Sequence, residues 1–238
     1  MSPYGYGNYV TEDEKKYKAA KAIAKLRKKN PDIMPVVIEG KTLAKTWWGK
    51  IWNNNLESYA DYSNRISRGR SYVRCNMVLD LKITKGTVEA LVMGSGTKPY
   101  EVLVKIDTLK KEKWERVIKE CNSSIESMEQ LMEGKFPKEL EALFTEKKFG
   151  LFPSPDEIRF ACSCPDWADM CKHVAAVLYG IGARLDNDPL LFFELRDIDS
   201  QELIKKSIET KLDNMLKNAG KKSNREISDE DVFDLFGI

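Results

Sequence analysis

The sequence predicts an α+β protein with a small antiparallel sheet of about three strands, several helices, and a strand–loop–helix module clamped by cysteine and histidine side chains. Residues 72–106 alternate apolar and polar positions with a period of two, which is typical of strands. Amphipathic segments with helical spacing lie on both sides of this stretch. Three of the five cysteines lie within eleven positions of the only histidine.

The first helix is predicted from a capping signal followed by a basic run. Thr11 and Glu14 form a capping-box pattern, and acids in the first turn suit the helix dipole. Residues 15–29 contain eight lysines and arginines and no acid. Asn30 and Pro31 are expected to end this helix.

A tryptophan-rich helix and an arginine-rich connection follow. Trp47, Trp48 and Trp52 come directly after Thr46, and we expect them to build core, with at least one of them partly exposed. Residues 63–74 hold four arginines and no acid, and we interpret them as a loop ahead of the sheet. Gly69 in this loop would let the backbone approach a phosphate.

The strands are predicted as a three-stranded meander with turns at Gly86 and at residues 94–96. A helix is expected over residues 110–121, and the proline-containing residues 149–155 indicate a rigid linker. A short strand at residues 157–161 then leads into the cysteines, and an amphipathic helix follows them.

The cysteine and histidine pattern indicates a metal site. The four residues are spaced C-x-C, six residues, then C-x-H: Cys162, Cys164, Cys171 and His173. Three thiolates and one imidazole form a complete tetrahedral set for zinc and leave no open position for a substrate. We therefore expect one structural Zn²⁺ ion and no catalytic residue. Cys171 and His173 would diverge by about 200° on a regular helix, so Cys171 is expected at the turn into the helix and His173 in its first turn.

Two alternatives remain for these residues. Cysteines and a lone histidine can cluster by accident as inert core residues. A cysteine–histidine pair can also form a nucleophilic site, but that interpretation leaves two neighbouring thiols unexplained.

The C-x-C and C-x-H pattern over residues 162–173 resembles the SWIM-type zinc finger. Residues 47–49, 58–62, 68–74 and 152–155 also resemble prokaryotic proteins that carry this finger, so the resemblance covers residues 45–198. It implies zinc at the four ligand residues, DNA or protein binding, and association with Swi–Snf-type helicase-like ATPases.

A nucleic-acid contact would need basic residues outside the finger, because Asp166 and Asp169 offset Lys172 and Arg184, and the net charge is only +2. Arginines near aromatic residues can hold phosphates and stack on bases. The arginine candidates lie beside Tyr62 and Tyr72: Arg65, Arg68, Arg70 and Arg74. The lysine candidates belong to the first helix, where a solvated basic face is the alternative: Lys15, Lys16, Lys18, Lys21 and Lys25.

Four segments are predicted: a basic arm and helix at 1–35, an α+β body at 36–150, a SWIM-type zinc finger module at 151–198, and a helix with an acidic, hydrophobic tail at 199–238. Residues 229–238 alternate acids with large apolar residues. They are interpreted either as a docking motif or as a last helical turn packed on the body.

Composition limits the function classes. A hydrophobic content of 42% is sufficient for a core. The longest uncharged apolar run is about half of the roughly 20 residues that a membrane span needs. No secretory signal is visible, so we expect a soluble, cytoplasmic protein with no small-molecule substrate. We predict a non-catalytic protein that binds DNA, or alternatively RNA, or that scaffolds a helicase-like ATPase. The alternatives are a pure protein–protein adaptor and a cysteine-dependent enzyme.

Overall fold

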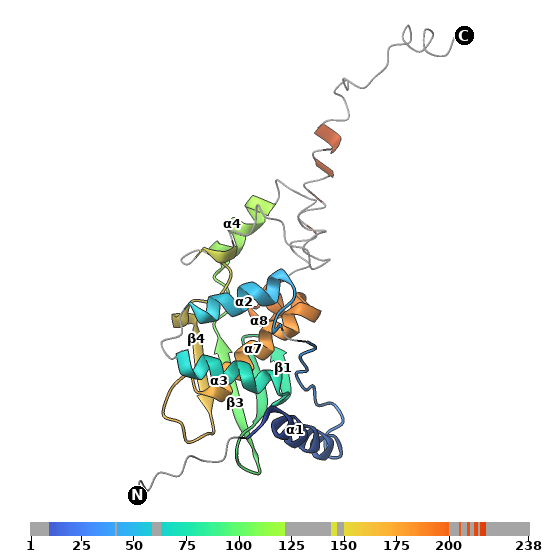
Figure 1. The fold of residues 1–238 in the computed structure, drawn as a ribbon. Coiled ribbons are helices and arrows are strands. Elements are labelled where there is room, and N and C mark those ends of the chain that lie inside the picture. Colours follow the sequence, from blue (N-terminus) through green and yellow to red (C-terminus); the bar gives the residue numbers. More distant parts are fainter. Residues whose placement is uncertain are drawn as a thin grey trace, which may run out of the picture.

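The computed structural model describes residues 10–40, 42–58, 63–121, 144–146 and 150–199, together with residues 205, 209, 212–213 and 215–217. These residues form a four-stranded antiparallel sheet in chain order, covered by helices (Figure 1). The predicted α+β class is therefore confirmed.

The sheet contains the predicted meander and a fourth strand. Its strands are β1 (Val78–Thr84), β2 (Thr87–Met93), β3 (Pro99–Ile106) and β4 (Ile158–Cys162). Strand β4 pairs with β3, with Cys162 opposite Val102 and Ile158 opposite Ile106. The strand that leads into the cysteines is thus an edge strand of the same sheet.

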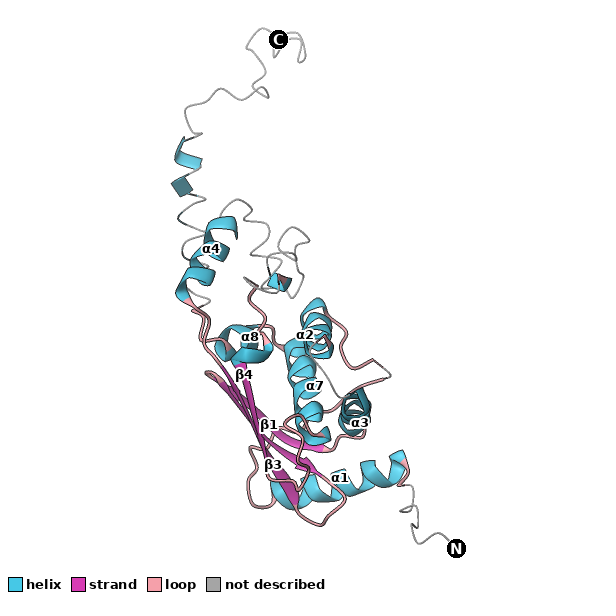
Figure 2. Ribbon diagram, turned by 90° about the vertical axis from the view of Figure 1, so that its left-hand side faces the viewer, coloured by secondary structure: helices cyan, strands magenta, loops and turns pink. Residues whose placement is uncertain are grey.

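One face of the sheet carries the main hydrophobic core. The helices α2 (Trp47–Glu57), α3 (Ser63–Arg74), α7 (Lys172–Asn187) and α8 (Leu190–Leu195) gather on this side (Figure 2). Helix α7 is central, because it packs against α2, α3 and each of the four strands. The period-two apolar residues of the strands face it, among them Val88, Val92 and Val104, all completely buried.

The expectation for the tryptophans is confirmed. Trp48 and Trp52 are 0% and 1% exposed, whereas Trp47 is only partly buried at the edge of the core. The core also includes Leu151 and Phe152, which belong to the predicted linker. Residues on both sides of position 150 therefore share one hydrophobic core among the described residues.

Helix α1 (Glu12–Arg27) packs on a second, smaller cluster at the start of β1 and the end of β2. The predicted capping box is present. The Thr11 hydroxyl accepts from the backbone N–H of Glu14 at 3.3 Å, and the Glu14 carboxylate accepts from the backbone N–H of Thr11 at 2.8 Å. Ala19 is fully buried against the cluster, so the lysines around it face outward or sideways.

The arginine-rich segment is a helix, and the prediction of a loop at residues 63–74 was wrong. Ile66, Gly69 and Val73 recur at i, i+3 and i+7 and are all buried, which makes one apolar face of α3. A Cβ atom added at Gly69 would come within 2.6 Å of the Ala175 Cβ. The glycine therefore permits the close approach of α3 to α7, and it does not present the backbone to a phosphate.

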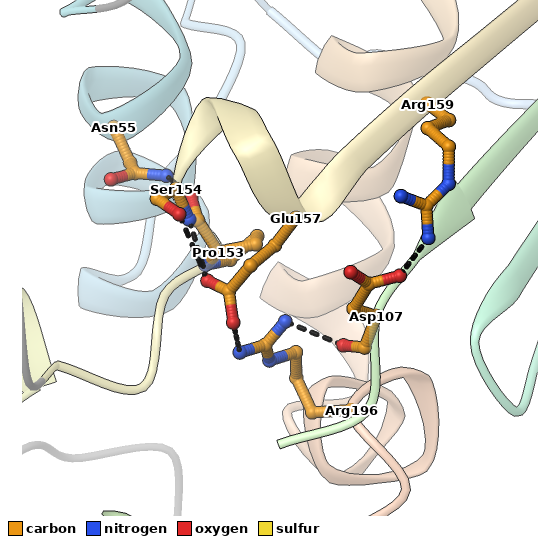
Figure 3. A network of polar contacts seen from close by, with 7 residues as sticks. All are labelled: Asn55, Asp107, Pro153, Ser154, Glu157, Arg159 and Arg196. Atoms are coloured by element: carbon orange, nitrogen blue, oxygen red, sulfur yellow. Dashed lines mark hydrogen bonds and ion pairs between the residues drawn. The ribbon is translucent and has the colours of Figure 1, made fainter. Parts of the chain in front are cut away.

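A polar network holds the connection between the sheet and α8 (Figure 3). The completely buried Arg196 donates to the Glu157 carboxylate at 3.0 Å and to the Asp107 carbonyl at 2.6 Å. Burial alone would raise the pKa of Glu157. The Ser154 backbone N–H and the Arg196 guanidinium outweigh this effect, so the pKa is lowered. Asp107 also pairs with the exposed Arg159 on β4.

Replacing Glu157 by glutamine is expected to lower the free energy of unfolding by about 3 kcal/mol, because the Arg196 guanidinium then stays buried without a carboxylate. Urea denaturation at pH 7 measures this loss. Replacing Arg159 by glutamine is the matched control, and removing that exposed pair should cost less than about 1 kcal/mol.

The same comparison has an expected pH dependence. Since the pKa of Glu157 is lowered on folding, its contribution is complete above the unfolded value of about 4.3 and disappears as the pH falls through the folded value. The difference between the wild type and Glu157→Gln should therefore shrink in acid. A difference that stays constant below that range would contradict the ion-pair explanation.

Helix α4 (Lys111–Cys121) forms where the sequence predicts it, and a short 3-10 helix, η1 (Pro155–Glu157), precedes β4. Most of the helix expected after residue 199, and the whole of residues 229–238, lie outside the described residues. In the described part of the chain, no helix combines the length and apolar character that crossing a membrane requires.

Candidate metal centre

The four residues singled out by their spacing converge at one end of the sheet. The ligand atoms of Cys162, Cys164, Cys171 and His173 all lie within 4.8 Å of one another. Cys162 ends β4, and Cys164 lies in the bend that directly follows the strand. The Nδ1 atom of His173 lies 3.9 Å from the Cys162 sulfur and 3.8 Å from the Cys171 sulfur. This cluster can hold a metal ion.

The start of α7 holds the other two residues of the cluster at the predicted positions. Cys171 is the N-cap residue, and its sulfur accepts from the backbone N–H of Val174 at 3.5 Å. His173 lies in the first helical turn. Because α7 packs at the centre of the core, the two ligands on it are held by the main body of the protein.

Two tyrosines fix the ring of His173. The Tyr100 ring centroid lies 4.6 Å from that of the imidazole, and the Tyr72 centroid lies 5.5 Å away. The histidine is only 3% exposed, and its Nε2 atom is buried with no hydrogen-bond partner among the described residues. The ring therefore presents Nδ1 to the thiols, which leaves Nε2 on the side of Tyr100 and Gly94.

The pKa values of the three clustered cysteine thiols shift in different directions. The hydrogen bond from Cys162 is the largest influence on Cys171 and lowers its pKa to about 3, with further lowering by His173 and the Val174 N–H. The same hydrogen bond, followed by burial, raises the pKa of Cys162. Burial also raises the pKa of Cys164. A bound cation would displace the remaining thiol protons, and three sulfurs with one imidazole nitrogen are ligands that zinc favours, so the cluster has the chemistry of a metal site.

The loop between the two ligand pairs is held by an ion pair. Arg65 on α3 contacts Asp166 at 3.0 Å, and both side chains are largely buried. Burial opposes ionisation of Asp166, but the N–H of Ala168 and the Arg65 guanidinium outweigh it and lower the pKa of Asp166. The next residue, Trp167, is 79% exposed. The loop thus presents a large aromatic side chain beside the metal cluster.

Two of the four candidate arginines form ion pairs with other described residues, and two do not. Arg65 is paired with Asp166, and Arg70 contacts the Glu57 carboxylate at 2.6 Å and the Tyr179 hydroxyl at 2.8 Å. Tyr179 in turn donates to Glu57, and burial followed by this hydrogen bond raises the pKa of Tyr179. Arg68 and Arg74 are exposed and form no ion pair with another described residue.

The candidate lysines divide in a similar way. Lys15 and Lys16 at the start of α1 act electrostatically on Cys75 at the end of α3, which places them near that helix. Lys18 donates to the carbonyls of Gly94 and Ser95 at 2.8 and 2.7 Å. Lys21 and Lys25 line a groove between α1 and the β2–β3 turn.

Sequence reasoning missed the residues that support the centre. Tyr100 and Gly94 come from the β2–β3 hairpin, far from the ligands in sequence, and a Cβ atom at Gly94 would lie 2.3 Å from the Tyr100 ring. Lys172 was treated only as a charge offset, yet its ammonium group lies 5.7 Å from the Tyr72 ring centroid. No local pattern marks these contacts, because each joins segments that only the fold brings together.

Comparison with known proteins gives one informative similarity. No family model matches the sequence, and no solved structure matches it significantly. The chain is 34% identical over 163 residues to a protein of Mycobacterium tuberculosis (strain ATCC 25618 / H37Rv) described as uncharacterized protein Rv2102. The match covers 68% of this chain and 58% of the relative, so this chain spans less than two thirds of the relative's length. The similarity shows that a related sequence exists in Mycobacterium tuberculosis, and it assigns no activity.

Proposed function

We propose that the cluster binds one structural Zn²⁺ ion and that the protein is a non-catalytic, SWIM-type zinc finger protein that contacts nucleic acid. The observation that carries the proposal is the convergence of three cysteine sulfurs and one imidazole nitrogen within 4.8 Å. Zinc favours this ligand set, and four protein ligands complete its tetrahedral shell. A complete shell leaves no position for a substrate, which supports a structural role.

The two sulfur separations from the His173 Nδ1 atom support zinc. Tetrahedral zinc with bonds of about 2.3 Å to sulfur and 2.0–2.1 Å to nitrogen separates a sulfur from a nitrogen ligand by about 3.6 Å. The two separations to the His173 Nδ1 atom, 3.8 and 3.9 Å, are longer by only a few tenths of an ångström. Cys162, Cys164, Cys171 and His173 would hold the ion, and the ion would join the edge of the sheet to the central helix.

A basic strip beside this centre is the best candidate for nucleic-acid contact. We define the basic strip as Arg68, Lys172, Lys15 and Lys16 around Tyr72. Arg68 lies one helical turn before Tyr72 and acts electrostatically on it, and Lys172 stacks near the tyrosine ring. Lys15 and Lys16 act electrostatically on Cys75 at the end of α3, where Glu12 partly offsets their charge. Cations around an aromatic ring suit phosphates and a stacked base.

A protein partner is a second proposed role. The exposed Trp167 lies in the loop between Cys164 and Cys171, which we call the metal loop. The Arg65–Asp166 pair fixes the position of this loop. Aromatic residues on rigid supports often dominate protein interfaces. A helicase-like ATPase is the partner class that the SWIM resemblance implies. An adaptor without nucleic-acid affinity would use the same tryptophan.

Fluorescence anisotropy of the zinc-loaded protein with single- and double-stranded DNA tests the proposal. We expect binding at about 50 mM salt that weakens steeply by 200 mM, because each phosphate contact contributes about −0.7 to −0.9 to the slope of log K against log salt. The triple variant Arg68→Gln, Lys172→Gln and Lys16→Gln should reduce the magnitude of that slope by about 2 to 3 and weaken binding.

The control variant removes three positive charges from lysines outside the basic strip. Lys50, Lys82 and Lys105 are exposed and lie outside the basic strip, so replacing all three by glutamine should leave most of the affinity. Zinc content is measured for each variant, because Lys172 is adjacent to two ligands. Absence of binding at the lower salt, or equal weakening by both triple variants, would contradict the nucleic-acid proposal. Retention of DNA binding by a Trp167→Ala variant that loses a protein partner would separate the two roles.

A further inference from the structure

A groove between α1 and the β2–β3 turn has an unusual combination of walls and floor. Its volume is about 460 Å³, which is within the range of ligand-binding clefts. Five lysines line it and no acidic residue does: Lys18, Lys21, Lys25, Lys29 and Lys98. We call this feature the lysine groove.

The floor of the lysine groove is apolar. Leu79 and Met93 are buried side chains of the small core cluster, and Ala22 and Leu26 of α1 pack against that cluster. Pro99 closes the floor at the start of β3. Lys18 fixes the opposite wall, because its ammonium group donates to the carbonyls of Gly94 and Ser95 in the turn.

The other four lysines of the groove have no counter-ion among the described residues. Lys21, Lys25, Lys29 and Lys98 form no ion pair with another described residue, and all four are exposed. Lys21 and Lys25 are spaced i, i+4 on α1, and like charges at that spacing destabilise a helix. An anionic occupant would remove this repulsion and cover the apolar floor.

The floor indicates a peptide more than a nucleic acid. No aromatic side chain lines the groove, so bases would find no stacking surface. Apolar side chains flanked by carboxylates would match both the floor and the rim. An acidic, hydrophobic peptide therefore matches both the lysines at the rim and the apolar floor of the groove. A nucleic acid would match only the lysines.

The same chain contains a segment of this chemistry. Residues 229–238 carry four acids, at positions 229, 230, 231 and 234, and five large apolar residues: Val232, Phe233, Leu235, Phe236 and Ile238. About 30 residues separate this segment from Asp199; the described residues between 205 and 217 are helical, with a rise of about 1.5 Å per residue, and the other positions span at most about 3.3 Å each. A domain of about 150 residues is only about 40 Å across, so the segment can reach any part of the surface.

We propose that the lysine groove is a docking site for residues 229–238 of the same chain. The carboxylates pair with the groove lysines, and the phenylalanines cover the partly exposed Ala22 and Leu26 above the buried Leu79 and Met93. This proposal is independent of zinc binding and of the basic strip.

Carbodiimide cross-linking of the full chain tests it directly, because this reagent joins a lysine to a carboxylate only when the two are in contact. We expect mass spectrometry to find links from residues 229–234 to Lys21, Lys25, Lys29 or Lys98. The equally exposed Lys50, Lys82 and Lys105 should give none. A mixture of ¹⁴N- and ¹⁵N-labelled chains identifies the source of the segment, and links within one isotope support docking in the same chain. Predominant mixed-isotope links would overturn that assignment in favour of a second copy.

A peptide-binding experiment separates specific docking from charge attraction. The probe is a labelled peptide of residues 228–238, added to full-length protein in which Phe233→Ser and Phe236→Ser weaken the internal competitor. Replacing Lys21, Lys25 and Lys29 by glutamine is expected to weaken peptide binding by at least about tenfold. Leu26→Ser should also weaken it, because it makes the floor polar.

The matched control removes the same number of charges from the same helix and its cap. Lys15, Lys16 and Lys28 do not line the groove, so their replacement by glutamine should change the affinity by less than about twofold. Equal effects of the two triple variants, or no peptide binding, would overturn the proposal. So would DNA binding that is lost with the groove lysines while the peptide fails to bind, since the groove would then be a nucleic-acid site.

Discussion

Replacing Cys171 by serine is expected to abolish stoichiometric zinc binding and to destabilise the whole described fold. Serine is a good N-cap residue, so it should still accept from the Val174 N–H that the cysteine sulfur accepts from now. The substitution therefore removes a metal ligand while keeping the helix cap. Structural zinc contributes about 10–16 kcal/mol to folding in isolated finger peptides.

The effect should extend beyond the metal loop. Helix α7 packs on α2, α3 and the sheet, so loosening its first turn weakens the central core. We expect a loss of at least about 4 kcal/mol, or a fall in Tm of about 8–16 °C for a protein of this size. Metal analysis and calorimetry measure both, and a chelator should produce the same fall in the wild type.

Cys75→Ser is the control for this experiment. Cys75 is fully buried but lies outside the metal cluster, in the small core beneath α1. Its replacement should lower stability while keeping one zinc per chain. If Cys171→Ser binds zinc like the wild type and melts at the same temperature, the assignment of the ligands is wrong. Thiols that react rapidly in the metal-loaded wild type would favour a cysteine-dependent enzyme.

Replacing Trp52 by alanine is expected to lower the free energy of unfolding by about 3–5 kcal/mol. Trp52 is 1% exposed between α2 and α7, and its indole N–H donates to the Leu178 carbonyl at 2.8 Å. Alanine would leave a cavity where these helices meet, and the neighbouring Gly182 lies so close that an added Cβ would be 2.5 Å from the Asn53 Oδ1 atom. Such close helix packing cannot collapse easily around the cavity.

Trp167→Ala is the matched control. It removes the same side chain at a position that is 79% exposed, so the free energy of unfolding should change by less than about 0.5 kcal/mol. Urea denaturation of both variants gives the comparison. Equal losses would show that Trp167 contributes to the fold as much as Trp52, which would weaken its proposed role in partner binding.

Local sequence determined the elements whose signals are short-range. The capping box of Thr11 and Glu14, the alternating strands of the meander and the helix after His173 depend on neighbours a few residues apart. The clustering of the three cysteines and His173 was also predictable, because their spacing lies within one strand end and one helix start. The interpretation of residues 63–74 failed because glycine, serine and arginine obscured a narrow apolar face of Ile66 and Val73.

Only the tertiary structure shows which arginines form ion pairs among the described residues and which distant segments pack together. Arg65 and Arg70 looked equivalent to Arg68 and Arg74 in sequence, yet their carboxylate partners come from other elements. The pairing of β4 with β3, the tyrosines on His173 and the lysine groove likewise join distant segments. The physical reason is range: hydrogen bonds within a turn or helix are encoded by adjacent residues, whereas burial and ion pairing depend on which surfaces the whole chain packs together.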